Sequence, residues 1–178
     1  MKKTIGIFGG TFDPPHNGHV LTAAQLSKTV DLLYVNPAYN PKYKKCTEAK
    51  HRYEMCELAF ENIRNLEVVE IDIQNKFQYT YQTINYLSRT FIQTVRFVIF
   101  VGEDWDVRTF KNYELFSKQC KIVAFPRPGY GLSNADIQLK ISSSDIRSNL
   151  KKKLPINGLV PQKVLEYIEN NDIYKKRR

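Results

Sequence analysis

The stretch that decides the fold is IGIFGGTFDPPHNGHV, residues 5–20. It opens with a short apolar run that is typical of a buried strand, and Gly9 and Gly10 close that run. Glycine has no Cβ, so backbone N–H groups at these two positions can come close to a ligand. The helix expected next would point its positive N-terminal end into the same crevice. This order predicts a phosphate-binding turn between the first strand and the first helix.

Two histidines, His16 and His19, flank the expected start of that helix near Gly18. Imidazole N–H groups at this place can donate to phosphate oxygens and stabilise charge that builds up during phosphoryl chemistry. The same spacing occurs in metal sites, but no third ligand lies nearby and the glutamate of HExxH is missing, so we expect no protein-held metal. The dinucleotide fingerprint GxGxxG and the Walker motif GxxxxGK[ST] are both absent from the chain.

Apolar runs alternate with helix-compatible stretches along the whole chain. The runs are nearly continuous, which is typical of strands that are buried on both faces. We expect strands at 5–8, 32–35, 66–73, 95–101 and 122–125, and helices at 20–29, 50–62, 81–91, 107–118 and 164–170. This order predicts an α/β fold, a doubly wound Rossmann-like parallel sheet with helices on both faces, in a single domain over residues 1–174. Its ligand site should lie beyond the carboxyl ends of the strands.

The composition limits location and partners. The 178 residues are 42% hydrophobic, but no apolar segment is long enough to span a membrane and no secretory leader precedes the first strand. We therefore expect a cytoplasmic protein without a membrane partner. The three cysteines are odd in number and widely spaced, which fits neither a disulfide framework nor a paired-cysteine metal site.

The formal net charge is +9, and it implies a positive potential that attracts polyanions. Nucleotide phosphates and nucleic acid are both candidates, and a solvated basic surface is the alternative for any one cluster. The basic residues are scattered over several segments, which disfavours a nucleic-acid site. The last four residues, 175–178, read KKRR and are expected to form a disordered tail.

A second motif, ISSSDIR, occupies residues 141–147. Ser142 and Ser143 are good helix N-caps, so they predict a second helix start that can bind an anion, and Arg147 can add a forked donor to the same phosphates. Alone, this pattern would also suit an ordinary capped helix. Its occurrence together with the first motif favours the phosphate interpretation.

The two motifs resemble those of the bacterial nicotinate-nucleotide adenylyltransferases, a family of the nucleotidylyltransferase superfamily with the (T/H)xGH signature. GGTFDPPHNGH at 9–19 is similar to the N-terminal signature, and ISSSDIR is similar to the late ISSTxIR motif. The resemblance extends through HRYEM at 51–55, QYTYQT at 78–83, the segment 102–104, RPGY at 127–130 and the final VPQKVLEYIENNDIY at 160–174.

The chain also departs from the family pattern at two places. Tyr43 stands where the family's PPHK loop has histidine, which leaves Lys44 as the matching cation. Phe110 and Lys111 are nearest to the family's Trp-Tyr pair, whose indole stacks on the pyridine ring, in a segment about two residues shorter than the family's. Trp105 is a second candidate for that stacking role.

The resemblance implies an adenylyltransferase that joins ATP and nicotinate mononucleotide into deamido-NAD and pyrophosphate. It implies catalytic roles for His16, His19 and Arg147. It places ATP on Gly9, Gly10, Thr11, Phe12, His16, His19, Lys44, Gly102, Asp104, Ser142, Ser143 and Arg147, and the mononucleotide on Tyr79, Thr80, Phe110 and Trp105. Mg²⁺ is the expected cofactor, bound mainly through ATP phosphates and water. The alternatives are a preference for nicotinamide mononucleotide or another phosphomonoester, and a nucleic-acid-binding module on the same fold.

Overall fold

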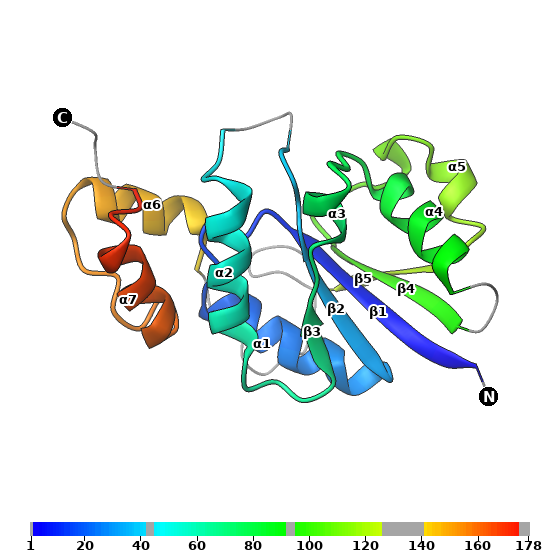
Figure 1. Ribbon diagram of the computed structural model, residues 1–178, viewed down its shortest axis with the longest axis horizontal. Coiled ribbons are helices and arrows are strands. Elements are labelled where there is room, and N and C mark those ends of the chain that lie inside the picture. The colour runs from blue at the N-terminus through cyan, green and yellow to red at the C-terminus, as the bar shows by residue number, and fades with distance from the viewer. Residues whose placement is uncertain (1, 42–44, 92–94, 126–140, 175–178) are drawn as a thin grey trace.

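A five-stranded parallel sheet with the order β3-β2-β1-β4-β5 forms the centre of the protein (Figure 1). The structure is a computed structural model, and it describes residues 2–41, 45–91, 95–125 and 141–174. The strands are β1 Lys3–Gly10, β2 Leu32–Pro37, β3 Leu66–Val68, β4 Val95–Gly102 and β5 Lys121–Phe125. The order changes direction at β1, so β1 and β4 flank the point where a doubly wound sheet binds its ligand. The predicted fold class is confirmed.

Helices cover both faces of the sheet, as predicted. They are α1 Asn17–Leu26, α2 Ala49–Phe60, α3 Ile71–Gln74, α4 Thr80–Thr90, α5 Tyr113–Phe116, α6 Ser143–Lys151 and α7 Gln162–Asn170, with 3-10 turns η1 Ser27–Thr29 and η2 Val107–Thr109. Phe8, Leu33 and Phe100 pack against α1 and α2 on one face. Ile7 and Ile99, which point the other way, pack against α4 and α5. Successive side chains of a strand alternate between faces, and both faces are apolar here.

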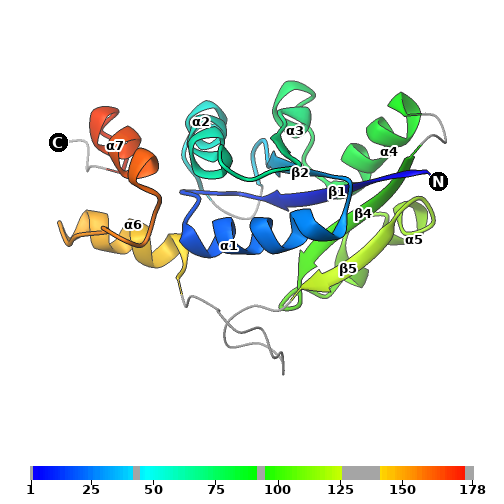
Figure 2. The ribbon, with the colours of Figure 1, turned by 90° about the horizontal axis from the view of Figure 1, so that it is seen from below.

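The last two helices lie beyond the carboxyl end of β1, at the opposite end of the molecule from α4 and α5 (Figures 1 and 2). Buried side chains of α6 and α7, including Ile146, Val164 and Ile168, join the core of the α1–α2 face. The backbone N–H and the side chain of Asn17 donate to the carbonyls of Leu159 and Gly158 at 3.0 Å and 2.8 Å. The C-terminal part of the chain is therefore docked on the start of α1.

Two predicted elements are wrong. The strand predicted at 66–73 ends at Val68, which pairs with Val35 of β2, and the Val69 N–H makes one more bond, to the carbonyl of Val35 at 2.9 Å. The chain then turns into α3, whose Asp72 N–H donates to the side chain of Asn36.

The helix predicted at 107–118 is also wrong, since only η2 and α5 form there. Asn112 lies between them with φ of 58°, in the left-handed region that interrupts a right-handed helix. The helix predicted at 20–29 begins earlier, at Asn17.

Among the described residues, no helix combines the length and apolar composition that a membrane span requires. The basic tail expected at 175–178 lies outside the described residues, and so does Lys44.

Gly6 is a position where the first strand has no room for a side chain. A Cβ there would lie 2.7 Å from Cε2 of Phe100 and 3.0 Å from Cδ1 of Leu33. We expect Gly6→Ala to lower the free energy of unfolding by about 1–3 kcal/mol through overpacking, measured by urea denaturation. Gly9→Ala is the matched control in the same strand, since its Cβ meets nothing within 4 Å. Equal stability of the two variants would contradict this reading of the packing.

Candidate functional site

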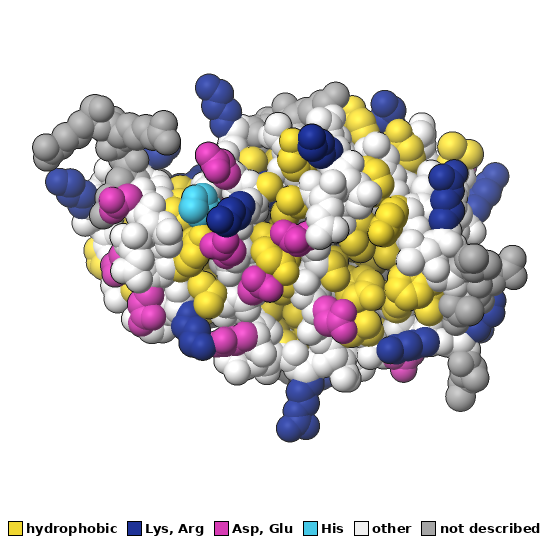
Figure 3. Space-filling view, in the orientation of Figure 1, with side chains coloured by type: hydrophobic (Ala, Val, Ile, Leu, Met, Phe, Trp, Pro, Cys, Tyr) yellow, Lys and Arg dark blue, Asp and Glu magenta, His cyan; other side chains and the backbone are white. Residues whose placement is uncertain are grey.

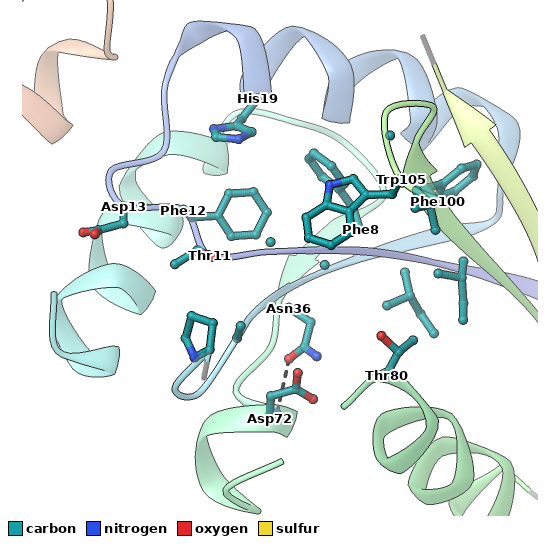
Figure 4. Close-up of a pocket in the computed structure, with 18 of the residues that line it drawn as sticks. Phe8, Thr11, Phe12, Asp13, His19, Asn36, Asp72, Thr80, Phe100 and Trp105 are labelled. Atoms are coloured by element: carbon teal, nitrogen blue, oxygen red, sulfur yellow. Dashed lines mark hydrogen bonds between the residues drawn. The ribbon is translucent and has the colours of Figure 1, made fainter. Parts of the chain in front are cut away.

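A cavity of 730 Å³ opens at the carboxyl ends of β1, β2 and β4 (Figure 4). It is bordered by the starts of α1, α4 and α6. The predicted site residues that line it are Gly9, Gly10, Thr11, Phe12, His16, His19, Tyr79, Thr80, Gly102, Trp105, Phe110, Ser142, Ser143 and Arg147. The fold thus brings both sequence motifs and both parts of the predicted mononucleotide site to one cavity.

Two predicted residues are not placed on the cavity wall. Asp104 lies in the turn after β4, where it is exposed, and is not among the lining residues. Lys44 lies outside the described residues.

The two histidines cap α1 and each other. His19 N–H donates to Nδ1 of His16 at 3.3 Å, and His16 N–H donates to Nδ1 of His19 at 3.2 Å. Their rings stack with centroids 3.7 Å apart. Because each Nδ1 accepts a hydrogen bond, a neutral ring carries its proton on Nε2. Both imidazoles therefore have an Nε2–H donor, fixed in direction by the helix start itself.

The turn after β1 offers backbone to the cavity. A Cβ on Gly9 would meet no atom within 4 Å, so this position faces open space. Phe12 has a positive φ of 50° and turns its ring into the core, against Phe8 and Phe60 with centroids 5.4 Å and 5.9 Å away. A positive φ is uncommon for a residue with a side chain, and packing of the Phe12 ring holds it here.

The second motif docks directly on the first. Ser142 is the N-cap of α6, as predicted, and its hydroxyl accepts from Asp145 N–H at 3.1 Å. The Ser143 hydroxyl donates to the carbonyl of Pro14 at 2.8 Å. Arg147 donates from Nη1 to the carbonyl of Asp13 at 2.7 Å, and Arg147 is also one of the residues that line the cavity. The N-terminal ends of α1 and α6 are thereby held beside one space, which suits an anion with several phosphates.

Aromatic side chains form the opposite end of the cavity. The rings of Trp105 and Phe110 meet edge to face with centroids 6.0 Å apart. Phe110 also packs on the core between the sheet and α4, whereas Trp105 is 45% exposed. Lys111 places its ammonium 4.5 Å from the centre of the Tyr79 ring. These residues give this end of the cavity an aromatic lining with a nearby cation.

The lining residues that the sequence did not predict include four polar ones with hydrogen-bonding side chains: Asp13, Asn36, Asp72 and Thr83. Asn36 directly follows the apolar run at 32–35, and polar residues at strand ends are a usual signal of a ligand site. Asp72 lies in the segment 66–73, which was predicted as a strand, so it was not expected at the site. Thr83 donates to its carboxylate at 2.6 Å. Burial raises the pKa of the Asp72 carboxyl, against the effect of the bonds from Thr83 and Asn36.

Within the described ranges, no group of three His, Cys, Asp or Glu side chains lies close enough to hold a metal ion. The lining residues supply N–H and O–H donors and include Arg147, together with the carboxylates of Asp13 and Asp72. The donors suit a polyanion.

Comparisons with known proteins agree with this arrangement. A family model described as cytidylyltransferase-like matches residues 7–149. The nicotinate-nucleotide adenylyltransferase of Bacillus subtilis (strain 168) is 36% identical over 191 residues, covering 98% of this chain and 100% of that protein. A probable nicotinate-nucleotide adenylyltransferase of Thermus thermophilus is 34% identical, covering 96% and 99%. A Plasmodium falciparum nicotinic acid mononucleotide adenylyltransferase, solved in complex with NaAD, has the same fold, with a TM-score of 0.83, 20% identity and 97% coverage of both chains.

The raised pKa of the Asp72 carboxyl predicts that the free energy of unfolding depends on pH. Because the folded-state pKa lies above the ordinary value of 3.8, the folded protein holds this proton more tightly than the unfolded chain. Asp72 therefore lowers the free energy of unfolding as pH rises from about 4 through the raised pKa. We expect the difference in that free energy, Asp72→Asn minus wild type, to increase over this window and then level off. Urea denaturation at a series of pH values measures it, and a constant difference would contradict the assignment.

Proposed function

This chain belongs to the cytidylyltransferase-like family and, within it, to the nicotinate-nucleotide adenylyltransferases, and we infer from this membership that it joins ATP and nicotinate mononucleotide into deamido-NAD and pyrophosphate. It is thus an enzyme of NAD biosynthesis. The observation that carries this inference is the meeting of two phosphate-binding helix starts and an aromatic surface in one cavity. One end suits a triphosphate and the other suits a planar ring.

In the proposed reaction, the 5′-phosphate of the mononucleotide attacks the α-phosphorus of ATP in line, and pyrophosphate leaves. No covalent bond to the protein forms, so the work of the residues is positioning and stabilisation of charge. The turn at Gly9–Phe12 would take the ATP phosphates on backbone N–H groups. His16 and His19 would donate Nε2–H to the transferring phosphate, where charge develops in the transition state.

The start of α6 would hold the departing part of ATP. Ser142 and Ser143 stand at the positive end of this helix, and Arg147 adds a guanidinium to it. Charge on the pyrophosphate grows as the bond breaks, so donors fixed there would favour the transition state over bound ATP. Gly102 and Asp104, at and after the end of β4, are proposed on the adenosine side. Lys44 remains a proposed phosphate contact.

Mg²⁺ stays in the proposal as part of the ATP complex. Mg²⁺ keeps several waters and is usually held by one or two carboxylates together with substrate phosphates. The cavity is rich in donors for phosphate, and the described residues provide no three-ligand cluster, so the residues fit an ion bound mainly through ATP and water. When bound, the ion would neutralise charge on the phosphate oxygens.

The mononucleotide is proposed at the aromatic end. Tyr79 and Thr80 begin α4, whose N-terminal N–H groups suit the carboxylate of nicotinate. Trp105 or Phe110 would stack on the pyridine ring. An enzyme that prefers nicotinamide mononucleotide or another phosphomonoester is the alternative within this class.

A nucleic-acid-binding module would require a continuous basic surface. On the face drawn in Figure 3, Lys and Arg side chains are scattered around the rim, and Asp and Glu side chains lie among and between them. A duplex or a single strand binds a continuous basic stripe, which is not present on that face. The cytoplasmic location expected from the sequence stays a prediction.

The direct test is release of pyrophosphate from ATP with nicotinate mononucleotide, with nicotinamide mononucleotide, and with neither. We expect kcat/KM for the acid to exceed that for the amide by about tenfold or more, since a carboxylate at a helix start gains charge-assisted hydrogen bonds. A higher value for the amide would select the alternative substrate. No release with either, together with tight salt-dependent binding of an oligonucleotide, would support the binding module.

A pair of variants decides which ring stacks on the pyridine. We expect Trp105→Ala to raise KM for the mononucleotide roughly tenfold, because a stacking contact is worth about 0.5–1.5 kcal/mol beyond area burial. KM for ATP and the melting temperature should stay unchanged, since Trp105 is half-exposed. Phe110→Ala should lower the melting temperature as well, because Phe110 packs on the core. A mononucleotide-specific defect confined to Phe110→Ala would assign stacking to Phe110.

A further inference from the structure

The carboxylate of Asp13 is buried at the outer side of the phosphate-binding turn, with the residue 3% exposed. Tyr174 donates its phenol O–H to Oδ1 at 2.6 Å, and Thr47 donates its backbone N–H to Oδ2 at 3.3 Å. Nη1 of Arg147 lies 3.9 Å from Oδ2. Figure 4 shows the Asp13 carboxylate pointing away from His19, so these bonds hold the turn from behind.

The chain takes an unusual path to bring Tyr174 to this place. After α7, Asp172 and Tyr174 both have positive φ, at 53° and 69°. Ile173 between them is buried in the core, and its N–H donates to the carbonyl of Ile168 at 3.1 Å. This turn after α7 brings the phenol of Tyr174 to Asp13 in the first motif.

Tyr174 and Arg147 both approach the carboxylate of Asp13, Tyr174 at Oδ1 and Arg147 at Oδ2. Burial, followed by the charge of Asp13, raises the pKa of Tyr174, so the phenol keeps its proton and stays a donor. Without that donor, Oδ1 of Asp13 would be buried without a hydrogen bond among the described residues. The nearby cation that could compensate is the guanidinium of Arg147, with Nη1 3.9 Å from Oδ2. Nη1 of Arg147 already donates to the Asp13 carbonyl at 2.7 Å, so it would move from 3.9 Å onto the carboxylate and draw the guanidinium further from the cavity that Arg147 lines.

We propose that Tyr174 is a positioning residue for adenylyl transfer, and this rests on the proposed function. By occupying the Asp13 carboxylate, it keeps the Gly9–Phe12 turn in place and leaves the Arg147 guanidinium directed at the phosphates of ATP. Tyr174 itself does not contact substrate, and it acts only through these two groups.

Tyr174→Phe removes only the phenol oxygen, and Tyr167→Phe is its matched control. Tyr167 also donates to a carboxylate, that of Glu54, and bonds to His51, but at the contact of α2 and α7 and outside the cavity wall. We expect Tyr174→Phe to lower kcat/KM for ATP about tenfold or more and to leave KM for the mononucleotide within about twofold. Tyr167→Phe should leave all of these constants at the wild-type values. Both are assayed at a temperature where thermal unfolding shows them to be folded.

A double-mutant cycle with Arg147→Lys separates positioning from general stability. If Tyr174 acts through Arg147, the loss in kcat/KM of the double variant is clearly smaller than the product of the single losses. Multiplicative losses, or a Tyr174→Phe variant that matches Tyr167→Phe in every constant, would overturn the proposal.

Binding of a non-hydrolysable ATP analogue, measured by calorimetry, keeps the two proposals apart. If the wild type releases no pyrophosphate with nicotinate mononucleotide, the proposed function fails. A tenfold weaker Kd in Tyr174→Phe, with Tyr167→Phe unchanged, would still support the positioning role, and equal Kd values would overturn it.

Discussion

Two buried groups of opposite charge, the guanidinium of Arg52 and the carboxylate of Asp13, hold the turn after β1 in place. The guanidinium of Arg52 is 0% exposed and donates to the carbonyls of Thr47, Thr11 and Tyr39 at 2.7–2.8 Å. Asp13 is joined to it through Thr47, whose N–H it accepts. A buried charge without its hydrogen bonds is strongly unfavourable, with an effective penalty of several kcal/mol. The three loops that supply these oxygens therefore cannot move apart without leaving the Arg52 guanidinium unpaired. This requirement fixes the turn at Gly9–Phe12.

The cavity is assembled outward from that turn. Because the turn is fixed, the start of α1 is fixed, and the reciprocal bonds of His16 and His19 set the direction of both imidazoles. The C-terminal part of the chain then attaches to the same turn, through Ser143 on Pro14 and Arg147 on Asp13. Two motifs that are far apart in the sequence meet because side chains of the second donate to backbone carbonyls of the first.

This arrangement explains what the sequence could and could not reveal. Strands such as β1 were predictable because burial on both faces requires a continuous apolar run. The ends of other elements were not, because they depend on distant contacts, such as Asn36 capping Asp72, or on one left-handed residue, Asn112. The glycines, histidines and serines of the site could be predicted because their motifs are short and local. The role of Arg52 could not be predicted, because its partners are backbone carbonyls that any residue could supply.

The side chains at the two ends of the cavity differ in burial and in the number of hydrogen bonds that hold them. This difference matches the chemistry proposed for each end. In-line transfer depends on positions held within fractions of an ångström, so the phosphate end consists of backbone, helix starts and buried charges. Stacking tolerates small shifts because any flat ring offers a face. Side chains there can be half-exposed, as Trp105 is, with its ring meeting the ring of Phe110 edge to face. We therefore expect the transfer chemistry to tolerate the departure from the family's Trp-Tyr pair, because that departure lies at the aromatic end of the cavity.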